Sequence, residues 1–177
     1  MPLFSNNHIA IANPADIASI RILLNSAYRG EESKKGWTTE ANLIQGNVRT
    51  DDASLQQVIN QPGSVFLKYI DGAQKIVGCV NLQLHHPKMY LGMFSVSPAL
   101  QGGGIGKKLL QAAEEYAIHL HCIAIYMSVI TLREELINWY KRHGYCDTGK
   151  RIPFVEDGLS GKHTQLLEFM VMEKSIS

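Results

Sequence analysis

The residues most suited to chemistry lie in one glycine-rich stretch, QGGGIGKKLL, at positions 101–110. Glycine inside a helix costs about 0.5–1 kcal/mol relative to alanine, so a cluster that opens an amphipathic run requires an explanation. A dinucleotide fingerprint needs GxGxxG, and neither glycine frame supplies the third glycine. A P-loop would need glycine at Gln101 and serine or threonine at Lys108. Two interpretations stay open: backbone N–H groups at a helix start that cradle an anion, or a tight turn where a helix packs closely on a sheet.

The elements around this stretch predict a β-α-β unit over residues 89–129. Residues 89–98 have the pattern of a strand, which Pro98 ends. From Gly104 onward the apolar residues repeat with the period of a helix: Ile105, Leu109, Ala113, Tyr116, Ala117 and Leu120. Residues 122–129 form an apolar run that is typical of a buried strand. The crossover is expected to be right-handed, with the glycines between the first strand and the helix.

The rest of the chain predicts a mixed sheet with helices around it. Helices are expected over 14–28, around 39–45, over 51–61 and over 132–143, the last with Thr131 and Glu134 as a capping box and Gly144 as a stop. Strands are expected over 64–70 and 75–86, joined as a hairpin, and over 146–152 and 164–174. The predicted fold class is therefore α/β (α+β). No repeat or linker divides the chain, so residues 1–177 are expected to form one domain.

The composition excludes several classes of protein. The 177 residues are 45% hydrophobic and 19% charged, and a formal net charge of +1 gives no overall field that favours nucleic acid or an anionic membrane. The apolar runs are too short to cross a bilayer, and the first residues lack the pattern of a signal peptide. Cys79, Cys122 and Cys146 are odd in number and have no CxxC spacing. They predict buried, reduced thiols in a cytoplasmic protein, without a disulfide framework or a metal site.

Two stretches resemble the motifs of one enzyme superfamily. VSPALQGGGIGKKLL, at 96–110, resembles motif A of the GNAT N-acetyltransferases, Gln/Arg-x-x-Gly-x-Gly/Ala after a strand, through Gln101, Gly104 and Gly106. REELINWYKRHGY, at 133–145, resembles motif B, a helix that carries a tyrosine and ends in Gly-Tyr or Gly-Phe, through Tyr140, Gly144 and Tyr145. The motifs follow in the family's order, with one predicted strand between them. The resemblance implies a GNAT-like fold: a mixed, mostly antiparallel sheet with a central β-α-β unit, flanked by helices.

The resemblance also implies acetyl-coenzyme A (acetyl-CoA) as co-substrate, and no metal. Its pyrophosphate would bind in the loop that starts at Gln101, on the backbone amides of Gly102, Gly103, Gly104, Ile105, Gly106 and Lys107. Lys107 either adds charge there or belongs to a solvated helix face. The pantetheine arm would pair with the strand residues Phe94, Ser95 and Val96, and a backbone N–H near Phe94 would polarise the thioester carbonyl.

The activity that the resemblance implies is direct acetyl transfer to the primary amine of a small molecule. A peptide or protein amine is the alternative acceptor, and a non-catalytic acetyl-CoA-binding module is the alternative function. A nucleotide-binding domain is disfavoured by the two failed fingerprints. The resemblance involves neither nucleic acid nor a membrane, and it leaves open whether the chain forms a homodimer.

Tyr140 aligns with the tyrosine that protonates the leaving thiolate in the family. The general base is not assigned; the candidates are Glu31, Glu32, Glu40, His85 and His86, or a water relay through Tyr90 or Ser128. Arg133 stands where many members have an asparagine that contacts the cofactor, and it could bind a phosphate, bind the substrate or simply begin the helix. Trp37 and Glu40 could form a wall of the acceptor site, with an aromatic face and a carboxylate for a cation; packing of Trp37 onto the body is the alternative.

Overall fold

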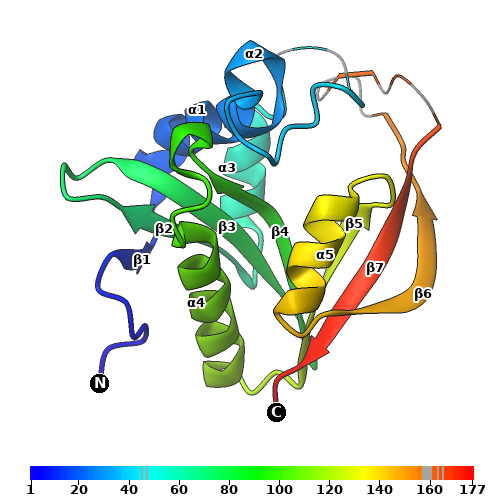
Figure 1. Cartoon of the computed structure of the whole chain (residues 1–177). Helices are drawn as coiled ribbons and strands as arrows, with labels where there is room; N and C mark the ends of the chain where they lie inside the picture. Colours follow the sequence, from blue (N-terminus) through cyan, green and yellow to red (C-terminus); the bar gives the residue numbers. More distant parts are fainter. Residues whose placement is uncertain (45, 47, 157–160, 163, 165) are drawn as a thin grey trace.

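A seven-stranded sheet forms the centre of the fold, with the strand order β1-β2-β3-β4-β5-β7-β6 (Figure 1). The computed structural model describes residues 1–44, 46, 48–156, 161–162, 164 and 166–177. The strands are β1 (Ile9–Ile11), β2 (Ser64–Ile70), β3 (Ile76–His85), β4 (Lys88–Val96), β5 (Ala124–Ile130), β6 (Cys146–Pro153) and β7 (Glu168–Ser175). The helices are α1 (Ile17–Tyr28), α2 (Gly30–Ser33), α3 (Asp52–Asn60), α4 (Ile105–His119) and α5 (Glu134–Arg142), with short 3₁₀ turns at Pro14–Asp16 and Pro98–Leu100.

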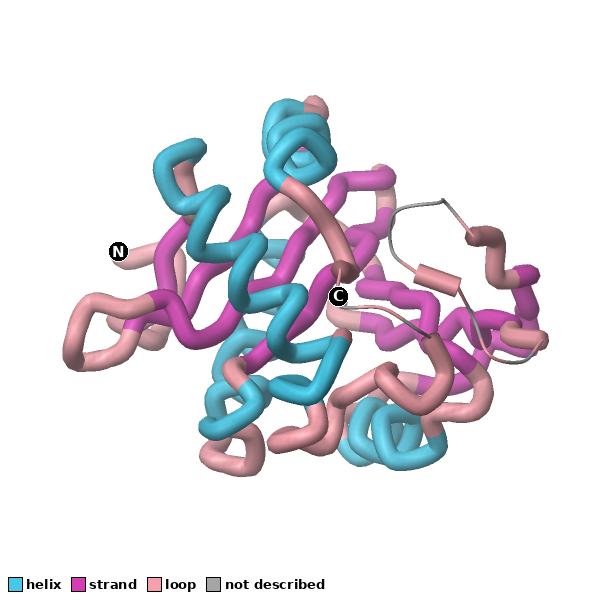
Figure 2. Tube along the Cα trace, turned by 90° about the horizontal axis from the view of Figure 1, so that it is seen from above, coloured by secondary structure: helices cyan, strands magenta, loops and turns pink. Residues whose placement is uncertain are grey.

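Helices cover both faces of the sheet, as the view from above shows (Figure 2). On one face, α4 and α5 bury Leu109, Ala113 and Ile137 against Met89 and Leu91 of β4. On the other face, α1 and α3 form a second core; its buried members include Ile20, Leu24, Leu55, Phe66 and Cys79. The predicted mixed, mostly antiparallel sheet is confirmed, because β4 and β5 are its one parallel pair among the described strands.

The parallel pair β4–β5 is short, and this shapes the centre of the molecule. Its register runs only from Lys88↔Ala124 to Tyr90↔Tyr126, although β4 continues to Val96 and β5 to Ile130. Beyond Tyr90 the two strands diverge. Among the described strands, none pairs with this edge of β4 over its second half.

A β-bulge lies in the same half of β4. Cys79 of β3 pairs with Ser95, but Asn81 pairs with Gly92, so one residue of β3 faces both Met93 and Phe94. Met93 has a φ of 46°, a left-handed conformation that is uncommon outside glycine. Bulges bend a strand and re-aim its side chains, and they are over-represented next to active sites.

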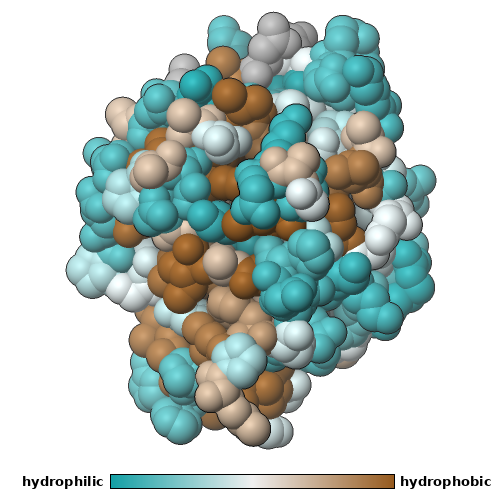
Figure 3. All heavy atoms as spheres, turned by 90° about the vertical axis from the view of Figure 1, so that its left-hand side faces the viewer, coloured by the Kyte–Doolittle hydropathy of each residue, from teal (hydrophilic) through white to brown (hydrophobic). Residues whose placement is uncertain are grey.

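On the side that holds β1 and β2, hydrophobic and hydrophilic residues are interspersed on the surface, and the hydrophilic ones predominate (Figure 3).

The structure corrects the predicted helix around residues 39–45. Only one turn forms, in which the N–H groups of Leu43 and Ile44 both donate to the Glu40 carbonyl. The Thr39 hydroxyl accepts a hydrogen bond from the Ala41 N–H at 3.1 Å. Local side-chain hydrogen bonds of this kind compete with helix formation.

The predicted capping box at Thr131 and Glu134 is also wrong. The helix α5 begins at Glu134 and Arg133 is its N-cap, so Glu134 lies too early to act as the third helical residue. The Thr131 N–H instead donates to the Glu168 carbonyl at 3.0 Å. Gly144 follows α5 with a φ of 94°, as expected of a helix stop.

Two smaller differences concern the edges of the sheet. Cys79 and Cys122 are buried as predicted, but Cys146 is exposed because it lies in β6, an edge strand that is mostly exposed. The three-residue strand β1 was not predicted, since so short a segment shows no alternation.

Candidate active site

An open cavity of about 540 Å³ lies between the start of α4, the second half of β4, and α5. Most residues that the sequence predicted as functional line it: Trp37, Phe94, Ser95, Val96, Gln101, Gly102, Gly104, Gly106, Lys107 and Tyr140. Glu40, Gly103 and Ile105 are absent from the lining, and Arg133 is part of it. Residues that sequence reasoning missed also face the cavity: Tyr28, Thr38, Leu100, Glu135, Leu136, Asn138, Trp139, Arg142 and His143.

The glycine-rich loop forms one end of the cavity. Gly102 and Gly104 have φ angles of 88° and 89°, which favour glycine strongly, and a Cβ at either position would meet nothing within 4 Å. Gly104 caps α4 without a side-chain hydrogen bond, and the first intrahelical bond of α4 runs from the Lys108 N–H to the Gly104 carbonyl at 3.1 Å. The N–H groups of residues 104–107 therefore have no partner within the helix.

The diverging edge of β4 forms the floor of the cavity. Ser95 is 3% exposed, and its Oγ has no hydrogen-bond partner among the described residues. A buried hydroxyl without a partner costs about 1–3 kcal/mol, so such a group calls for a ligand or a water. Together with the unpaired edge of β4, Ser95 offers hydrogen bonds to an extended, amide-containing ligand.

Tyr140 lies on the buried side of α5 and is 4% exposed. Its ring packs against Trp139, with centroids 5.2 Å apart, and against Phe94, with centroids 6.4 Å apart. Burial raises the pKa of the Tyr140 hydroxyl far above its ordinary value, and the nearby Tyr28 raises it further. The hydroxyl is therefore neutral at physiological pH and can donate a proton or a hydrogen bond.

Tyr28, the last residue of α1, fixes the bulge in β4. Its hydroxyl donates a hydrogen bond to the Phe94 carbonyl. Burial raises the pKa of Tyr28 to about 12. The Cys79 thiol donates to the neighbouring Met93 carbonyl at 3.7 Å, so two successive carbonyls of the bulge are held from different elements. The sequence offered no signal for this contact, because it joins residues 66 positions apart.

Residues 36–40, which we call the strap, connect the glycine-rich loop to α5. Gln101 Nε2 donates to Thr38 Oγ1 at 2.6 Å, and Arg133 Nη2 donates to the Thr38 carbonyl at 2.5 Å. A Cβ at Gly36 would lie 2.2 Å from Gln101 Oε1, so a larger residue there would displace the Gln101 amide from the strap. Trp37 is 38% exposed, and its ring lies 6.4 Å from that of Trp139 across the cavity mouth.

Glu40 ends the strap as a buried carboxylate between two guanidinium groups. Arg29 Nη1 donates to its Oε1, and Arg133 Nη1 donates to its Oε2 at 3.2 Å. Arg133 also stacks over the Tyr28 ring, 5.8 Å from its centroid. Both oxygens of Glu40 are thus occupied by positive partners, and Glu40 is not among the residues that line the cavity.

The candidates for a general base are scattered. Glu31 and Glu32 lie on the exposed α2 and pair with Lys34 and Lys35. His86 is exposed at the turn after β3. His143 does line the cavity, where its Nδ1 lies 2.7 Å from the Trp139 carbonyl. Among the described residues no group of three or more histidine, cysteine or acidic side chains could hold a metal ion, and no helix is long and apolar enough to cross a membrane.

Comparison with known proteins agrees with this geometry. The model of the Acetyltransferase (GNAT) family matches residues 18–145, which is more than half of the chain. The chain belongs to the GNAT acetyltransferase family. It is therefore an N-acetyltransferase of a family that uses acetyl-CoA. A search of curated proteins found no match.

Solved structures share the fold of this GNAT protein at low identity. The ribosomal-protein-S18-alanine N-acetyltransferase of Escherichia coli matches with a TM-score of 0.72 and 12% identity, over 96% of this chain and 93% of the other. A spermidine N-acetyltransferase SpeG chimera from Vibrio cholerae and hSSAT matches with a TM-score of 0.67 and 15% identity, over 94% and 93%. The yncA protein of Salmonella typhimurium, solved with its cofactor acetyl-CoA, matches with a TM-score of 0.69 and 19% identity, over 98% and 95%.

The residues of the cavity fit acetyl-CoA. The four open amides at the start of α4 suit a pyrophosphate, because a helix N-terminus carries partial positive charge. The unpartnered Ser95 hydroxyl and the unpaired edge of β4 suit an amide-rich arm. These features lie in one cavity, in the order in which an extended molecule would meet them.

Proposed function

We propose that this GNAT protein transfers the acetyl group of acetyl-CoA to the primary amine of a small molecule. One observation carries the proposal: a single cavity joins the open amides of residues 104–107, the unpartnered hydroxyl of Ser95 and the buried, neutral phenol of Tyr140. Such a transfer has three requirements. The enzyme must bind the pyrophosphate, align the pantetheine arm and protonate the thiolate that leaves.

The proposed cofactor contacts follow from this arrangement. The amides of Gly102 and of residues 104–107, together with the side chain of Lys107, bind the pyrophosphate, and Gln101 holds the loop against the strap. The Gly103 N–H instead donates to the Leu100 carbonyl at 3.4 Å. Phe94, Ser95 and Val96 bind the pantetheine arm along β4. Acetyl-CoA supplies the acetyl thioester, whose carbonyl carbon the amine attacks.

The proposed catalytic residue is Tyr140. Its hydroxyl donates a proton to the sulfur as the carbon–sulfur bond breaks, which makes the thiol a better leaving group; positioned acid catalysis of this kind contributes about 10²–10⁴-fold. A backbone N–H near Phe94 hydrogen-bonds the carbonyl oxygen as negative charge develops on it. Tyr28 supports this step by holding the Phe94 carbonyl and so the shape of the bulge.

A small acceptor is favoured by the strap. Thr38 is bonded on one side to Gln101 and on the other to Arg133, so the strap crosses between the glycine-rich loop and α5. A small amine passes such a crossing more readily than an extended peptide does. Trp37, at the mouth of the cavity, offers an aromatic face to the carbon skeleton or the cation of the acceptor.

An assay of free thiol release from acetyl-CoA tests the proposal. A panel of amino acids, polyamines and other small primary amines is compared with short peptides that have free N-termini or lysines. Release with small amines is the expected result. Release with peptides alone would overturn the choice of acceptor, and tight acetyl-CoA binding in calorimetry without turnover on any amine would identify a non-catalytic module.

A further inference from the structure

An amine acceptor must lose a proton before it attacks, because an alkylamine with a pKa of about 10 is mostly ammonium near neutral pH. The cavity described above supplies an acid, Tyr140, but its cofactor side does not identify the group that receives the amine proton. The inference below concerns that group, and it rests on the proposed function.

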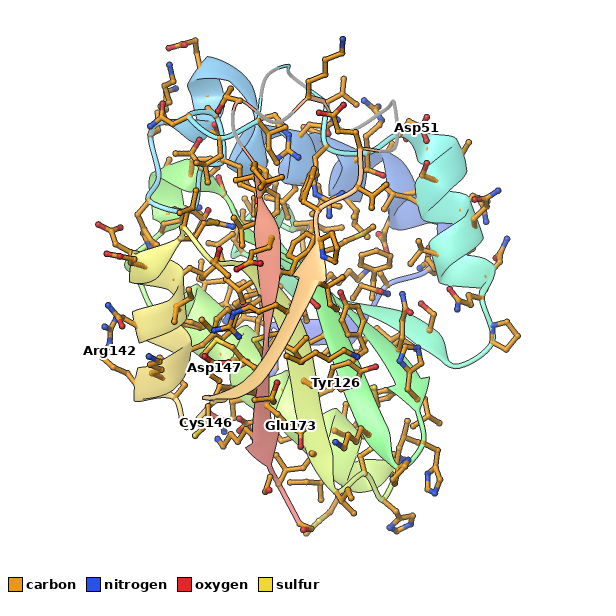
Figure 4. The ribbon with its side chains drawn as sticks, turned by 90° about the vertical axis from the view of Figure 1, so that its right-hand side faces the viewer. Asp51, Tyr126, Arg142, Cys146, Asp147 and Glu173 are labelled. Carbon is orange, nitrogen blue, oxygen red and sulfur yellow. The ribbon has the colours of Figure 1, made fainter. Side chains whose placement is uncertain are left out.

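The place where β4 and β5 part is marked by two tyrosines. Tyr90 and Tyr126 are the last residues paired across the parallel strands. Their side chains project away from the face that α4 covers, since Met89 and Leu91 on β4 and their counterparts on β5 are buried on that face. Tyr126 lies on β5 next to Glu173 of β7, on the side of the sheet that Figure 4 presents. The divergence of β4 and β5 therefore begins directly after these two tyrosines, which are not among the residues that line the cavity.

His85 extends this pair to the surface. Its Nδ1 lies 2.6 Å from the Tyr126 hydroxyl oxygen, and its ring stacks on that of Tyr90 with centroids 5.9 Å apart and an interplanar angle of 15°. The rings of Tyr90 and Tyr126 lie 5.3 Å apart. His85 itself is exposed at the end of β3, so a proton on its imidazole reaches solvent directly.

Tyr90 points from this cluster toward the bulge in β4. A Cβ added at Gly92 would lie 3.1 Å from a ring carbon of Tyr90 and 3.6 Å from its hydroxyl oxygen. The phenol thus lies over Gly92, one residue before the bulge at Met93 and Phe94. Any residue larger than glycine at position 92 would press on the Tyr90 ring.

We propose that Tyr90, Tyr126 and His85 form a relay that removes the proton from the acceptor amine. The ammonium N–H bond breaks, and its proton passes to the Tyr90 oxygen while the proton of Tyr90 passes to the Tyr126 oxygen, directly or through a water. The proton of Tyr126 passes to Nδ1 of His85. Both tyrosines end neutral, and His85 ends as a cation that releases its proton to solvent.

Electrostatics across the strands agrees with this arrangement. Burial raises the pKa of Tyr126, and the neighbouring Tyr90 raises it further; Tyr90 also contributes to the raised pKa of Tyr140. Tyr90 therefore lies within electrostatic reach of both Tyr126 and Tyr140. Lys88 and Glu173 are charged groups beside Tyr126, and their side chains form an ion pair at 2.8 Å. Because their charges are opposite, the pair adds little net charge next to the cluster.

The test compares His85→Asn and Tyr126→Phe with wild type in the rate of acetyl transfer as a function of pH. Asparagine is polar and fits an exposed position, and His119→Asn at the exposed end of α4 is the matched control. At neutral pH we expect kcat/KM for the amine to fall about 10²-fold in both relay variants, with unchanged acetyl-CoA affinity in calorimetry. The deficit should shrink as the pH approaches about 10, where the amine loses its proton without help.

An acceptor series gives a second readout that a merely structural role would not move. The deficit of His85→Asn should be smaller for amines of lower pKa, because less of such an amine is protonated. A deficit in kcat/KM that is constant across pH and amine pKa overturns the relay, and so does the absence of a deficit. A pH-dependent deficit in His143→Asn, with none in His85→Asn, would identify His143 as the proton acceptor instead. Failure of wild type to acetylate any amine overturns the proposed function and the relay with it, whereas an active wild type with an unimpaired His85→Asn overturns the relay alone.

Discussion

Replacing Glu40 by glutamine tests the network that joins the strap to α1 and α5. The side chains of Glu40, Arg29 and Arg133 are 11%, 2% and 9% exposed. Removal of one partner from a buried ion pair costs about 3–5 kcal/mol, because the remaining charge stays buried after it loses its counter-charge. In a chain of this size each kcal/mol changes Tm by about 2–4 °C. The expected fall in Tm is therefore about 6–20 °C.

Thermal unfolding followed by circular dichroism, at one protein concentration and one salt concentration, measures this fall. The matched control is Glu32→Gln, which removes a carboxylate that pairs with Lys35 at 2.9 Å on the exposed α2. An exposed pair of this kind contributes about 0.5 kcal/mol or less, so the Tm of the control should stay within about 2 °C of wild type. A Glu40→Gln protein that kept the wild-type Tm and showed a raised KM for the amine would refute the argument from burial. It would place Glu40 in the acceptor wall, as the sequence suggested.

Three further predictions concern the cavity and the edge of the sheet. Tyr140→Phe keeps the ring packing and removes only the hydroxyl, so the rate of the chemical step in pre-steady-state kinetics should fall about 10–10³-fold while acetyl-CoA affinity stays nearly constant. Gly104→Glu adds a side chain to a position with a φ of 89° and negative charge to the proposed phosphate site, so calorimetry should show loss of acetyl-CoA binding in a folded protein. The hydrogen bond from Arg151 lowers the pKa of Asp147 from 3.8 to about 2. A lowered pKa in the folded state means stabilisation that is present above pH 3.8 and is lost as the pH falls through about 2, so the Tm difference between wild type and Asp147→Asn should vanish by that pH.

Features that depend on neighbouring residues could be predicted from the amino-acid sequence. The start of α4 follows from the glycines at 102–106 and the apolar period that begins after them, and the structure confirms a helix from Ile105. The stop after α5 follows from Gly144 alone. These elements are local: their hydrogen bonds join residues three or four positions apart, so the residue types at those positions decide them.

The strap shows where local reasoning fails. A helix was predicted near residues 39–45, but the contacts that hold this segment reach Gln101 and Arg133, 63 and 95 positions away from Thr38. From the sequence, Glu40 was interpreted as a carboxylate near Trp37 that could bind a cation. In the folded chain, Arg29 and Arg133 donate hydrogen bonds to its two oxygens. No pattern in the strap itself encodes these partners.

The way in which the site is assembled around β4 could not be predicted from the sequence. The sequence predicted β4 and β5 as parallel strands, but it indicated neither that they part after Tyr90 nor that β4 has a bulge at Met93 and Phe94. Tyr28 holds that bulge from α1, and His85 meets Tyr126 from β3. Each of these contacts joins elements far apart in the chain. Their geometry depends on how whole layers pack, which the pattern of residues within one element does not specify.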